Sequence, residues 1–173
     1  MSGFRAILAT DEALGIGKAN DIPWHLPGDM AFFREHTTGS GRNAVIMGRK
    51  TYLAIPPRYR PLPDRLNVVL SRQEGAQFAG ARTMSGLETS IDTLNADDAI
   101  DDVWVAGGAG IYDAAFLLPG CREVLWTEVC GDFGCDVRVL EFRDRFELIR
   151  TSEPQEENGI TYRFHVLRPK KSV

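Results

Sequence analysis

Hydrophobic residues along the chain gather in short runs that are separated by polar and glycine-rich segments. Three of these runs, at residues 44–47, 66–70 and 103–106, are almost purely apolar, which is typical of interior strands covered on both faces of a sheet. Further strands are indicated near both ends of the chain. The complete set of predicted strands is 4–9, 44–47, 66–70, 103–106, 123–129, 146–150 and 161–167.

Helical stretches lie between these strands and are bounded by proline. Pro27 stands just before the first stretch and Pro119 just after the last, at positions that favour a helix start and a helix stop. The alternation of strands and helices predicts an α/β domain with a largely parallel sheet. Asn158 and Gly159 predict a turn, so the last two strands are expected to form an antiparallel hairpin at one edge. The predicted helices are 28–35, 50–55, 87–94 and 110–118.

Composition narrows the class of protein. The chain has 173 residues, of which 43% are hydrophobic and 25% charged, and these values suit an ordinary globular domain and exclude global disorder. No repeat or linker divides the sequence, so one domain is expected over residues 1–173. No apolar run reaches the ~20 residues that span a bilayer, and the first residues lack the layout of a signal peptide. Without heptads or an apolar stripe to suggest an interface, a cytoplasmic monomer that contacts no membrane is expected.

The cysteines do not indicate a disulfide bond or a metal site. Cys121, Cys130 and Cys135 are odd in number and lack CxxC spacing. Neither a disulfide framework nor a zinc site is therefore indicated, and no metal is expected.

A basic segment stands out against an acidic chain. The net charge of the whole sequence is −4, but residues 42–72 contain seven Lys or Arg residues and a single acidic residue, Asp64. Such a cluster favours a local site for an anionic ligand over general affinity for nucleic acid. Charge alone leaves open the alternative of a solvated charged face.

A strand-to-helix turn within this segment has the composition of a phosphate-binding turn. Gly48 ends a predicted strand, and Arg49, Lys50 and Thr51 follow it at the start of a helix. Free N–H groups at a helix start, together with cations and a hydroxyl, favour a phosphate. The P-loop pattern GxxxxGK[ST] is not met, because Arg49 separates the glycine from the lysine, and phosphoryl transfer is therefore disfavoured.

A second glycine-rich turn follows the strand at 103–106. It departs from the dinucleotide pattern GxGxxG because Asp113 stands where a small residue is needed, so by itself it is equally compatible with tight packing. Two such turns in one short domain favour a bound pyrophosphate. At the end of a third strand, Ser71 and Arg72 suit an additional phosphate, although a surface arginine after a strand needs no ligand.

The segment 15–33 places a carboxylate among apolar residues. A loop with two glycines leads through a Pro-Trp pair into a helix that begins near Asp29. Trp24, Leu26, Met30 and Phe33 would surround the Asp29 carboxylate with a poorly hydrated pocket, where it has to find a donor or change its pKa. This environment is typical of a ligand-binding carboxylate, although the first turn of any helix favours an acidic residue. The three histidines are scattered, and no nucleophile or metal motif is present.

Taken together, these features resemble the dihydrofolate reductase family from residue 6 to residue 167. The resemblance implies a central, mostly parallel eight-stranded sheet with an antiparallel C-terminal edge hairpin and helices on both faces. It also implies the NADPH-dependent reduction of 7,8-dihydrofolate to tetrahydrofolate, and inhibition by antifolates such as methotrexate or trimethoprim. Its motifs stand in the family's order: Gly15-Ile-Gly-Lys18, Ile22-Pro-Trp-His-Leu-Pro-x-Asp29, Val45-Ile-Met-Gly-Arg-Lys-Thr51, Arg60-Pro-Leu-Pro-x-Arg65, Val69-Leu-Ser-Arg72 and Gly107-Gly-x-x-Ile-Tyr112.

The resemblance also implies roles for single residues. Asp29 would hold the amidine-like edge of the pterin and promote protonation at N5, while hydride passes from the nicotinamide to C6. Thr127 would bind this carboxylate or a water beside it, Arg65 would clamp the glutamate α-carboxylate, and Arg72 indicates NADPH rather than NADH. Residues 15–22 match a mobile loop that closes over the nicotinamide. The implied catalytic residues are Asp29, Ile22, Trp24 and Thr127. The implied substrate-binding residues are Ile7, Leu8, Ala9, Met30, Phe33, Ile55, Leu62, Arg65, Ala106 and Tyr112. The implied cofactor-binding residues are Ala9, Ile16, Lys18, Gly48, Arg49, Lys50, Thr51, Leu70, Ser71, Arg72, Gly107, Gly108, Ala109, Gly110, Ile111 and Tyr112.

Several positions depart from the family's pattern. Asp64 replaces a glycine beside the proposed clamp, where it would weaken glutamate binding or pair with an arginine of residues 58–60. Ala106 replaces a larger branched residue and would enlarge the pocket floor near the pterin, which predicts weaker binding of antifolates that rely on contact there. Residues 137–142 lack the usual aromatic-proline pair, and residues 56–60 resemble longer, eukaryote-like forms.

Two other functions compete with this interpretation. A reductase of the same fold that acts on a pyrimidine precursor of riboflavin would keep the glycine turns but lack the Pro-Trp-x-Leu-Pro-x-Asp segment, which is intact here. A non-catalytic module that binds NADP or a pterin would have lost Asp29 or the glycine turns, and both are present. The sequence therefore favours the reductase of dihydrofolate.

Overall fold

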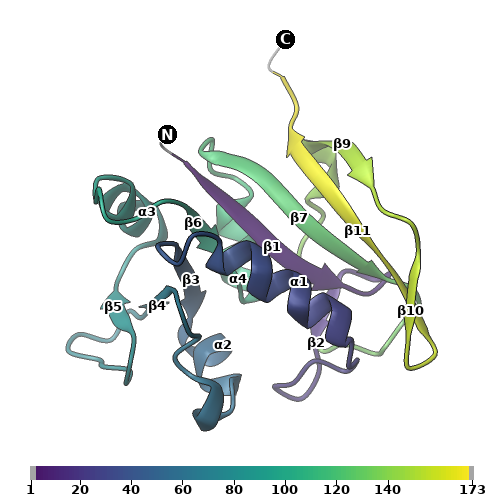
Figure 1. The fold of residues 1–173 in the computed structure, drawn as a ribbon, viewed down its shortest axis with the longest axis horizontal. Helices are drawn as coiled ribbons and strands as arrows, with labels where there is room; N and C mark the ends of the chain where they lie inside the picture. Colours follow the sequence, from purple (N-terminus) through teal and green to yellow (C-terminus); the bar gives the residue numbers. More distant parts are fainter. Residues whose placement is uncertain (1–2, 172–173) are drawn as a thin grey trace.

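A nine-stranded sheet forms the centre of the computed structural model, which describes residues 3–171 (Figure 1). Its strands follow the order β10-β11-β7-β1-β6-β3-β4-β5, and β9 also pairs with β11. A separate two-stranded sheet joins β2 to β8. The strands are β1 Phe4–Thr10, β2 Gly15–Gly17, β3 Ala44–Gly48, β4 Leu66–Leu70, β5 Arg82–Met84, β6 Val103–Val105, β7 Cys121–Val129, β8 Val137–Arg138, β9 Phe146–Thr151, β10 Gln155–Glu157 and β11 Ile160–Pro169.

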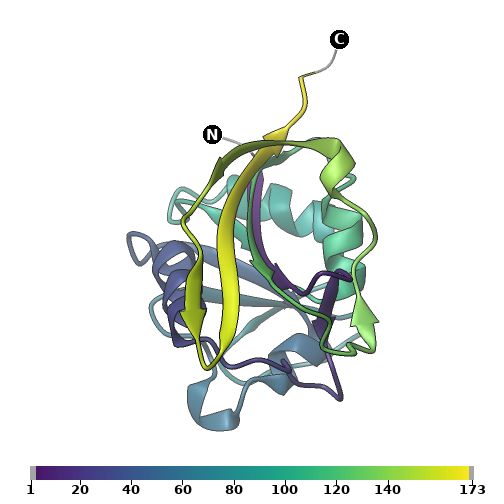
Figure 2. The same ribbon diagram turned by 90° about the vertical axis from the view of Figure 1, so that its right-hand side faces the viewer.

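The middle of the sheet is parallel and one edge is antiparallel, which confirms the predicted fold class. β1 pairs in parallel with β6 and β7, and β3 pairs in parallel with β6 and β4. β11 runs antiparallel to β7 and carries both β9 and β10 as antiparallel partners (Figure 2). The path from β10 to β5 has the eight strands expected, and β9 is a ninth.

The predicted turn at Asn158 and Gly159 joins β10 to β11, and not the two long strands. Both residues have positive φ angles, 51° and 75°, as a tight hairpin turn often requires. The strand β10 was missed because its residues, Gln-Glu-Glu, are all polar and give no hydrophobic pattern. β2, β5 and β8 were missed for a related reason, since each has only two or three residues.

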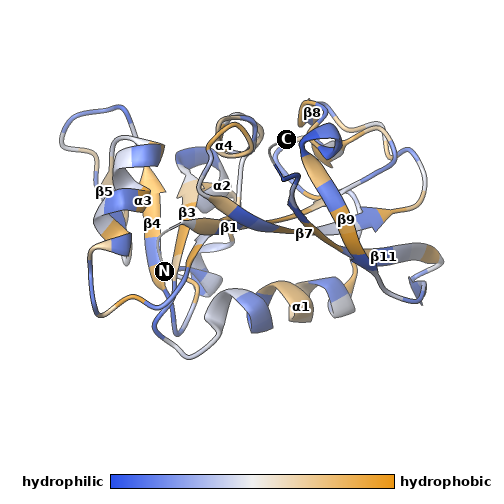
Figure 3. Cartoon of the chain, turned by 90° about the horizontal axis from the view of Figure 1, so that it is seen from above, coloured by the Kyte–Doolittle hydropathy of each residue, from blue (hydrophilic) through white to orange (hydrophobic). Residues whose placement is uncertain are grey.

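Within the described residues, four α-helices cover the two faces of the sheet. α1 and α4 lie on opposite faces, as Figure 3 shows. The first helix runs farther than predicted, to Thr38, and the last ends earlier, at Ala115. None of these helices has the length and apolar character that crossing a membrane requires. The helices are α1 Pro27–Thr38, α2 Arg49–Ala54, α3 Leu87–Asn95 and α4 Ala109–Ala115, with short 3-10 turns at Pro57–Tyr59 and Arg143–Arg145.

Alternating strand residues build a core on each face. Leu8 and Ile46 pack into a cluster with residues of α3 and α4, while Ile7, Val45 and Trp104 belong to a cluster against which α1 and α2 pack. Because β1, β3, β4 and β6 are parallel, their carboxyl ends meet at one edge of the sheet. Ligands of open α/β sheets bind at such an edge.

Candidate active site

The glycine turns that follow β3 and β6 touch at the carboxyl edge of the sheet. The Gly48 N–H donates a hydrogen bond of 2.9 Å to the Gly107 carbonyl. Gly107 has a φ of 118°, which disfavours any side chain, and a Cβ on Gly108 would lie 3.2 Å from Thr51 Oγ1. Gly48 and Gly108 directly precede α2 and α4, so the free N–H groups at the two helix starts lie close together.

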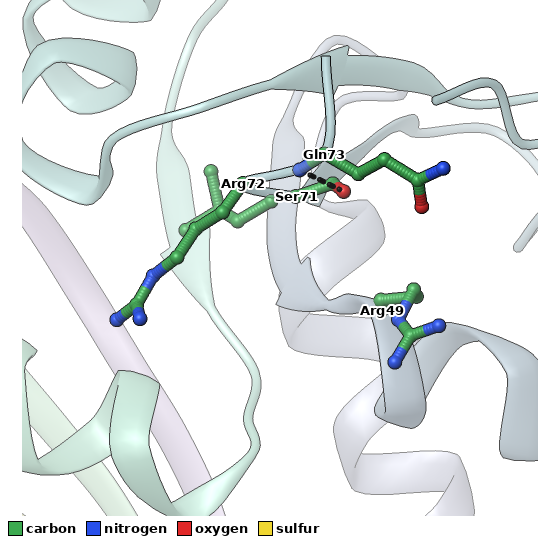
Figure 4. A pocket seen from close by; sticks show the side chains of 5 residues that line it. Arg49, Ser71, Arg72 and Gln73 are labelled. Atoms are coloured by element: carbon green, nitrogen blue, oxygen red, sulfur yellow. Dashed lines mark hydrogen bonds between the residues drawn. The ribbon is translucent and has the colours of Figure 1, made fainter. Parts of the chain in front are cut away.

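A cavity of about 320 Å³ lies between the start of α2 and the end of β4 (Figure 4). Arg49 contributes from α2, and Leu70, Ser71, Arg72 and Gln73 contribute from the end of β4 and the residues after it. Ser71 Oγ accepts a hydrogen bond of 3.2 Å from the Gln73 N–H. Two guanidinium groups beside a hydroxyl suit a phosphate.

The other residues predicted for this side are spread around the turns. Lys50 is exposed on α2 and does not line the cavity, and Lys18 is exposed in the loop after β2. Ile16, Ala109 and Ile111 are partly buried against the cluster under α4, and Gly110 is exposed.

Asp29 lies in the first turn of α1 and is bound to β7. Thr127 Oγ1 donates a hydrogen bond of 2.7 Å to Asp29 Oδ1, and Thr127 is itself buried, paired with Ala9 of β1. Burial raises the pKa of Asp29 above its ordinary value of 3.8, and the nearby charge of Glu157 raises it further, while the hydrogen bond from Thr127 opposes this rise. The net result is a carboxyl group with increased affinity for a proton, as at many reactive sites.

The segment before α1 is anchored by a small apolar core. Trp24 and Leu26 are buried with Val129 and Tyr162, and the Trp24 ring packs edge-on against Phe133 with 5.3 Å between centroids. This anchor fixes the start of α1 and therefore the reach of Asp29 to β7.

Two apolar side chains close to Asp29 in sequence remain exposed. Ile22 is 58% exposed and Met30 is 61% exposed, so neither contributes to the core. Large apolar side chains left in water are available to contact a ligand.

The predicted pocket wall is largely brought together. Phe33, Ile55, Leu62 and Ala106 all pack against the cluster that contains Ile7, on the face of the sheet covered by α1.

Leu8, also predicted to bind the substrate, faces away from this wall. Its side chain belongs to the cluster on the opposite face, because neighbouring residues of a strand point to opposite sides. Tyr112 packs in that cluster too, but its buried hydroxyl donates a hydrogen bond of 2.6 Å to the Ile7 carbonyl.

Arg65 stands at the end of the loop between the short 3-10 turn and β4. Its Nε donates to the Pro63 carbonyl at 2.7 Å, and its Nη1 donates to Thr37 Oγ1 of α1 at 2.9 Å. Burial lowers the pKa of Arg65, and the charge of Arg34 acts in the same direction, whereas the neighbouring Asp64 opposes them. Arg65 is therefore a partly desolvated guanidinium, which suits recognition of a carboxylate.

Asp64 occupies a left-handed position, with φ of 60°, which accounts for the glycine that the family pattern carries there. The expected pairing of Asp64 with a nearby arginine is not seen among the described residues. Arg60 instead donates to the Leu53 and Ile55 carbonyls, and Arg58 lies over the Tyr59 ring. The charge of Asp64 therefore acts on the neighbouring Arg65, whose pKa it raises against the effect of burial.

The loop at residues 15–22 is held to the segment that follows β7. β2 pairs with β8, Asp136 Oδ2 accepts a hydrogen bond of 3.0 Å from the Ala19 N–H, and the Asp136 N–H donates to the Gly17 carbonyl. Residues 137–142, which lack the family's aromatic-proline pair, thus begin as a strand, and they end with Phe142 buried in the core.

The sequence prediction missed two residues of this site, Glu157 and Tyr162. Glu157 Oε1 accepts a hydrogen bond of 2.8 Å from the Gly28 N–H and a second from the Tyr162 hydroxyl. Burial and the bond to Glu157 raise the pKa of Tyr162. No local motif marks these residues, because the contact joins segments 129 positions apart.

Comparison with known proteins gives a consistent result. The family model described as "Dihydrofolate reductase" matches residues 3–169. The dihydrofolate reductase of Drosophila melanogaster is 35% identical over 178 residues, which cover 96% of this chain and 98% of that protein. That of Rattus norvegicus is 36% identical over 180 residues, with 95% and 96% covered.

A solved structure shares the fold. The dihydrofolate reductase of Enterococcus faecalis, complexed with NADP(H) and RAB-propyl, superimposes with a TM-score of 0.84 at 27% identity, and the match covers 98% of this chain and 97% of that one.

Asn67 is expected to be essential for the loop that carries Arg65. Asn67 is buried, its Nδ2 donates to the Leu62 and Arg65 carbonyls, and its Oδ1 accepts from the Leu62 N–H. Asn67→Leu leaves these backbone groups unpaired and is expected to lower the free energy of unfolding by roughly 2–4 kcal/mol in urea titrations. The same substitution at Asn95, the last residue of α3, serves as the control. Equal losses for the two variants would contradict this role.

Proposed function

The chain belongs to the dihydrofolate reductase family and reduces 7,8-dihydrofolate to 5,6,7,8-tetrahydrofolate with NADPH, and we propose that Asp29 is the carboxylate on which the reaction depends. One observation supports this assignment above the others. Asp29 is a partly buried carboxyl group with a raised pKa, bound by Thr127 at the edge of the sheet where the two glycine turns meet.

The reaction needs a group that binds the pterin and also favours protonation of its N5 atom. Reduction adds a hydride to C6 of the pterin and a proton to N5, and NADPH when bound supplies the hydride. Ionised Asp29 pairs with the N–H donors of the amidine-like edge of the pterin, which is a charge-assisted contact. A raised pKa makes the protonated state of this region accessible closer to neutral pH, which favours protonation at N5.

The remaining catalytic assignments follow from position. Thr127 orients the Asp29 carboxylate from β7. Trp24 anchors the segment that leads into α1, and Ile22 is exposed beside it, free to cover a bound ligand.

The rest of the substrate is assigned to the α1 face of the sheet. The apolar side chains of Ile7, Phe33, Ile55 and Leu62 bury the flat pterin and benzoyl groups, and exposed Met30 adds to them. Arg65 binds the α-carboxylate of the glutamate. We assign the Arg65 Nη2 group as the donor to this carboxylate because, among the described residues, only Nε and Nη1 already have hydrogen-bond partners.

The cofactor is assigned to the two glycine turns and the cavity beside β4. The donor set fits a polyanion: backbone N–H groups at the starts of α2 and α4, the Thr51 hydroxyl, and the guanidinium groups of Arg49 and Arg72. We assign the pyrophosphate to the turns and the extra ribose phosphate of NADPH to Ser71 and Arg72.

Several broader properties belong to the same proposal. We propose that the chain is one domain, which the uninterrupted family match over residues 3–169 supports. We propose a cytoplasmic monomer, and the free thiols of the cysteines, Cys130 exposed among them, suit a reducing compartment. Methotrexate and trimethoprim are proposed as ligands of the substrate pocket.

The first test removes the ionisable group of Asp29. Asp29→Asn is expected to slow hydride transfer at neutral pH by about 10²- to 10⁴-fold, because the group that favours protonation is lost. NADPH affinity should change by no more than about 3-fold, a small free-energy difference. Stopped-flow absorbance of NADPH and fluorescence titration measure the two quantities, with Asp92→Asn, at an exposed position of α3, as the control. Equal losses in both quantities would contradict the role.

The same variant tests the pKa. Because the folded-state pKa of Asp29 is raised, the stability linked to its protonation is complete below the ordinary value of 3.8 and is lost as pH rises through the folded value. The amide of Asp29→Asn does not ionise, so its melting temperature should exceed the parent's by about 2–5 °C at pH 8. The difference should shrink on acidification, and a difference independent of pH would count against the shift.

The second test addresses the choice of cofactor. Arg72→Leu removes one charge-assisted contact to a phosphate and is expected to raise KM for NADPH by about 10- to 100-fold. KM for NADH should stay within about 2-fold of the parent's. Arg150→Leu, on exposed β9, is the matched control. A parallel rise for both cofactors would place Arg72 away from the distinguishing phosphate.

The third test concerns Ala106, which packs against the cluster of Ile7. Filling the space with Ala106→Ile is expected to tighten inhibition by antifolates that contact this position by about 3- to 30-fold, from the apolar area gained. Ala106→Val should give an intermediate inhibition constant. Inhibition constants of Ala106→Ile equal to the parent's would rule out the enlarged pocket.

A further inference from the structure

A second carboxylate, that of Glu157, is built against the start of the helix that carries Asp29. Glu157 is the last residue of β10, and its Oε1 reaches across to the first turn of α1, where it accepts a hydrogen bond of 2.8 Å from the Gly28 N–H. The Tyr162 hydroxyl, from β11, donates to the same oxygen. The negative charge is therefore held one residue before Asp29 in the helix.

The absence of a side chain at residue 28 makes this contact possible. A Cβ on Gly28 would collide with the Tyr162 hydroxyl and would lie 2.8 Å from Glu157 Oε1. Gly28 has no positive φ, so backbone conformation does not require glycine here. The close approach of the hairpin to the helix start is what requires it.

Within the described part of the chain, the two carboxylates have no cationic partner. Among residues 3–171, neither Asp29 nor Glu157 lies within ion-pair distance of a lysine, arginine or histidine. The titratable groups that interact with Asp29 come from three elements: the charge of Glu157 on β10 raises the pKa of Asp29, and the charge of Asp29 in turn raises the pKa values of Tyr162 on β11 and Tyr112 on α4. Both tyrosines are neutral at ordinary pH, since their pKa values are raised, and His25 on the preceding loop is exposed.

We infer that Glu157 is a positioning residue for the reduction: it acts through Asp29, supplying a fixed negative charge that keeps the proton on that carboxyl group to higher pH. The Gly28 N–H and the Tyr162 hydroxyl both donate to Glu157 Oε1 and so hold this carboxylate beside the first turn of α1, and an adjacent negative charge disfavours a second one on Asp29. The β10–β11 hairpin thus tunes the reacting carboxyl group without touching the substrate. The inference rests on the role proposed for Asp29.

The experiment separates charge from structure. In Glu157→Gln the amide oxygen still accepts both hydrogen bonds, but the charge is gone. The pH at which single-turnover hydride transfer falls to half is expected to move down by about half a unit to one unit. The rate on the acid plateau should stay within about 2-fold of the parent's, and the rate above the midpoint should fall by about 3- to 10-fold. Glu157→Asp, which keeps the charge, should restore the parent's profile.

The control is Glu156→Gln, which removes an equal charge from the adjacent, exposed residue of β10. Its profile should superimpose on the parent's. A Glu157→Gln profile that superimposes on the parent's, or a shift matched by Glu156→Gln, would overturn the inference and leave Glu157 a purely structural contact.

A measurement on the unmodified protein keeps the inference falsifiable if Glu157→Gln does not fold. ¹³C NMR of the side-chain carboxyl carbons should show Glu157 ionised throughout the range in which Asp29 titrates. Protonation of Glu157 above Asp29 would overturn the inference. The role of Asp29 is judged separately: a pH profile retained in Asp29→Asn would refute the proposed function, whatever Glu157 does.

Discussion

The hydrogen bond from Thr127 to Asp29 joins two parts of the chain that are 98 residues apart, and the architecture of the site depends on it. It ties the first turn of α1 to the sheet beside the carboxyl end of β1, because Thr127 pairs with Ala9 in the parallel β1–β7 ladder. The small apolar core around Trp24 fixes the segment that leads into α1. Without both restraints the carboxylate would lie in water, and its proton affinity would be ordinary.

The burial of Asp29 that raises its affinity for a proton also lowers the stability of the folded state. A carboxyl group taken out of water next to a second carboxylate destabilises the folded state when it is ionised, and the single hydroxyl of Thr127 offsets only part of this cost. Elsewhere the fold is consistent across levels, with apolar strands under helices and a parallel centre. Such a local conflict between stability and chemistry is common at the functional sites of enzymes.

Most residues of the candidate site could be predicted from the sequence because they belong to short, contiguous motifs. Gly48, Arg49 and Thr51 lie together in one turn. The segment that ends at Asp29 predicts a carboxylate among apolar side chains even without the family resemblance. The long apolar strands are equally plain. What could not be predicted is non-local or polar: β10 has no hydrophobic pattern, and the contact of Glu157 with α1 arises only when the hairpin folds back. The motif match also did not say to which side of the sheet the Leu8 side chain points, because it ignores strand alternation.

The bare backbone at residue 28 has an evolutionary consequence. Because the hairpin packs where a Cβ would be, any larger residue there has to displace the ends of the Glu157 and Tyr162 side chains, and a residue 157 that cannot accept a hydrogen bond leaves the Tyr162 hydroxyl without this partner. Substitutions at these three positions are therefore expected to be coupled. Among descendants of this sequence, drift at residue 28 should be accompanied by a remodelled hairpin some 130 residues away.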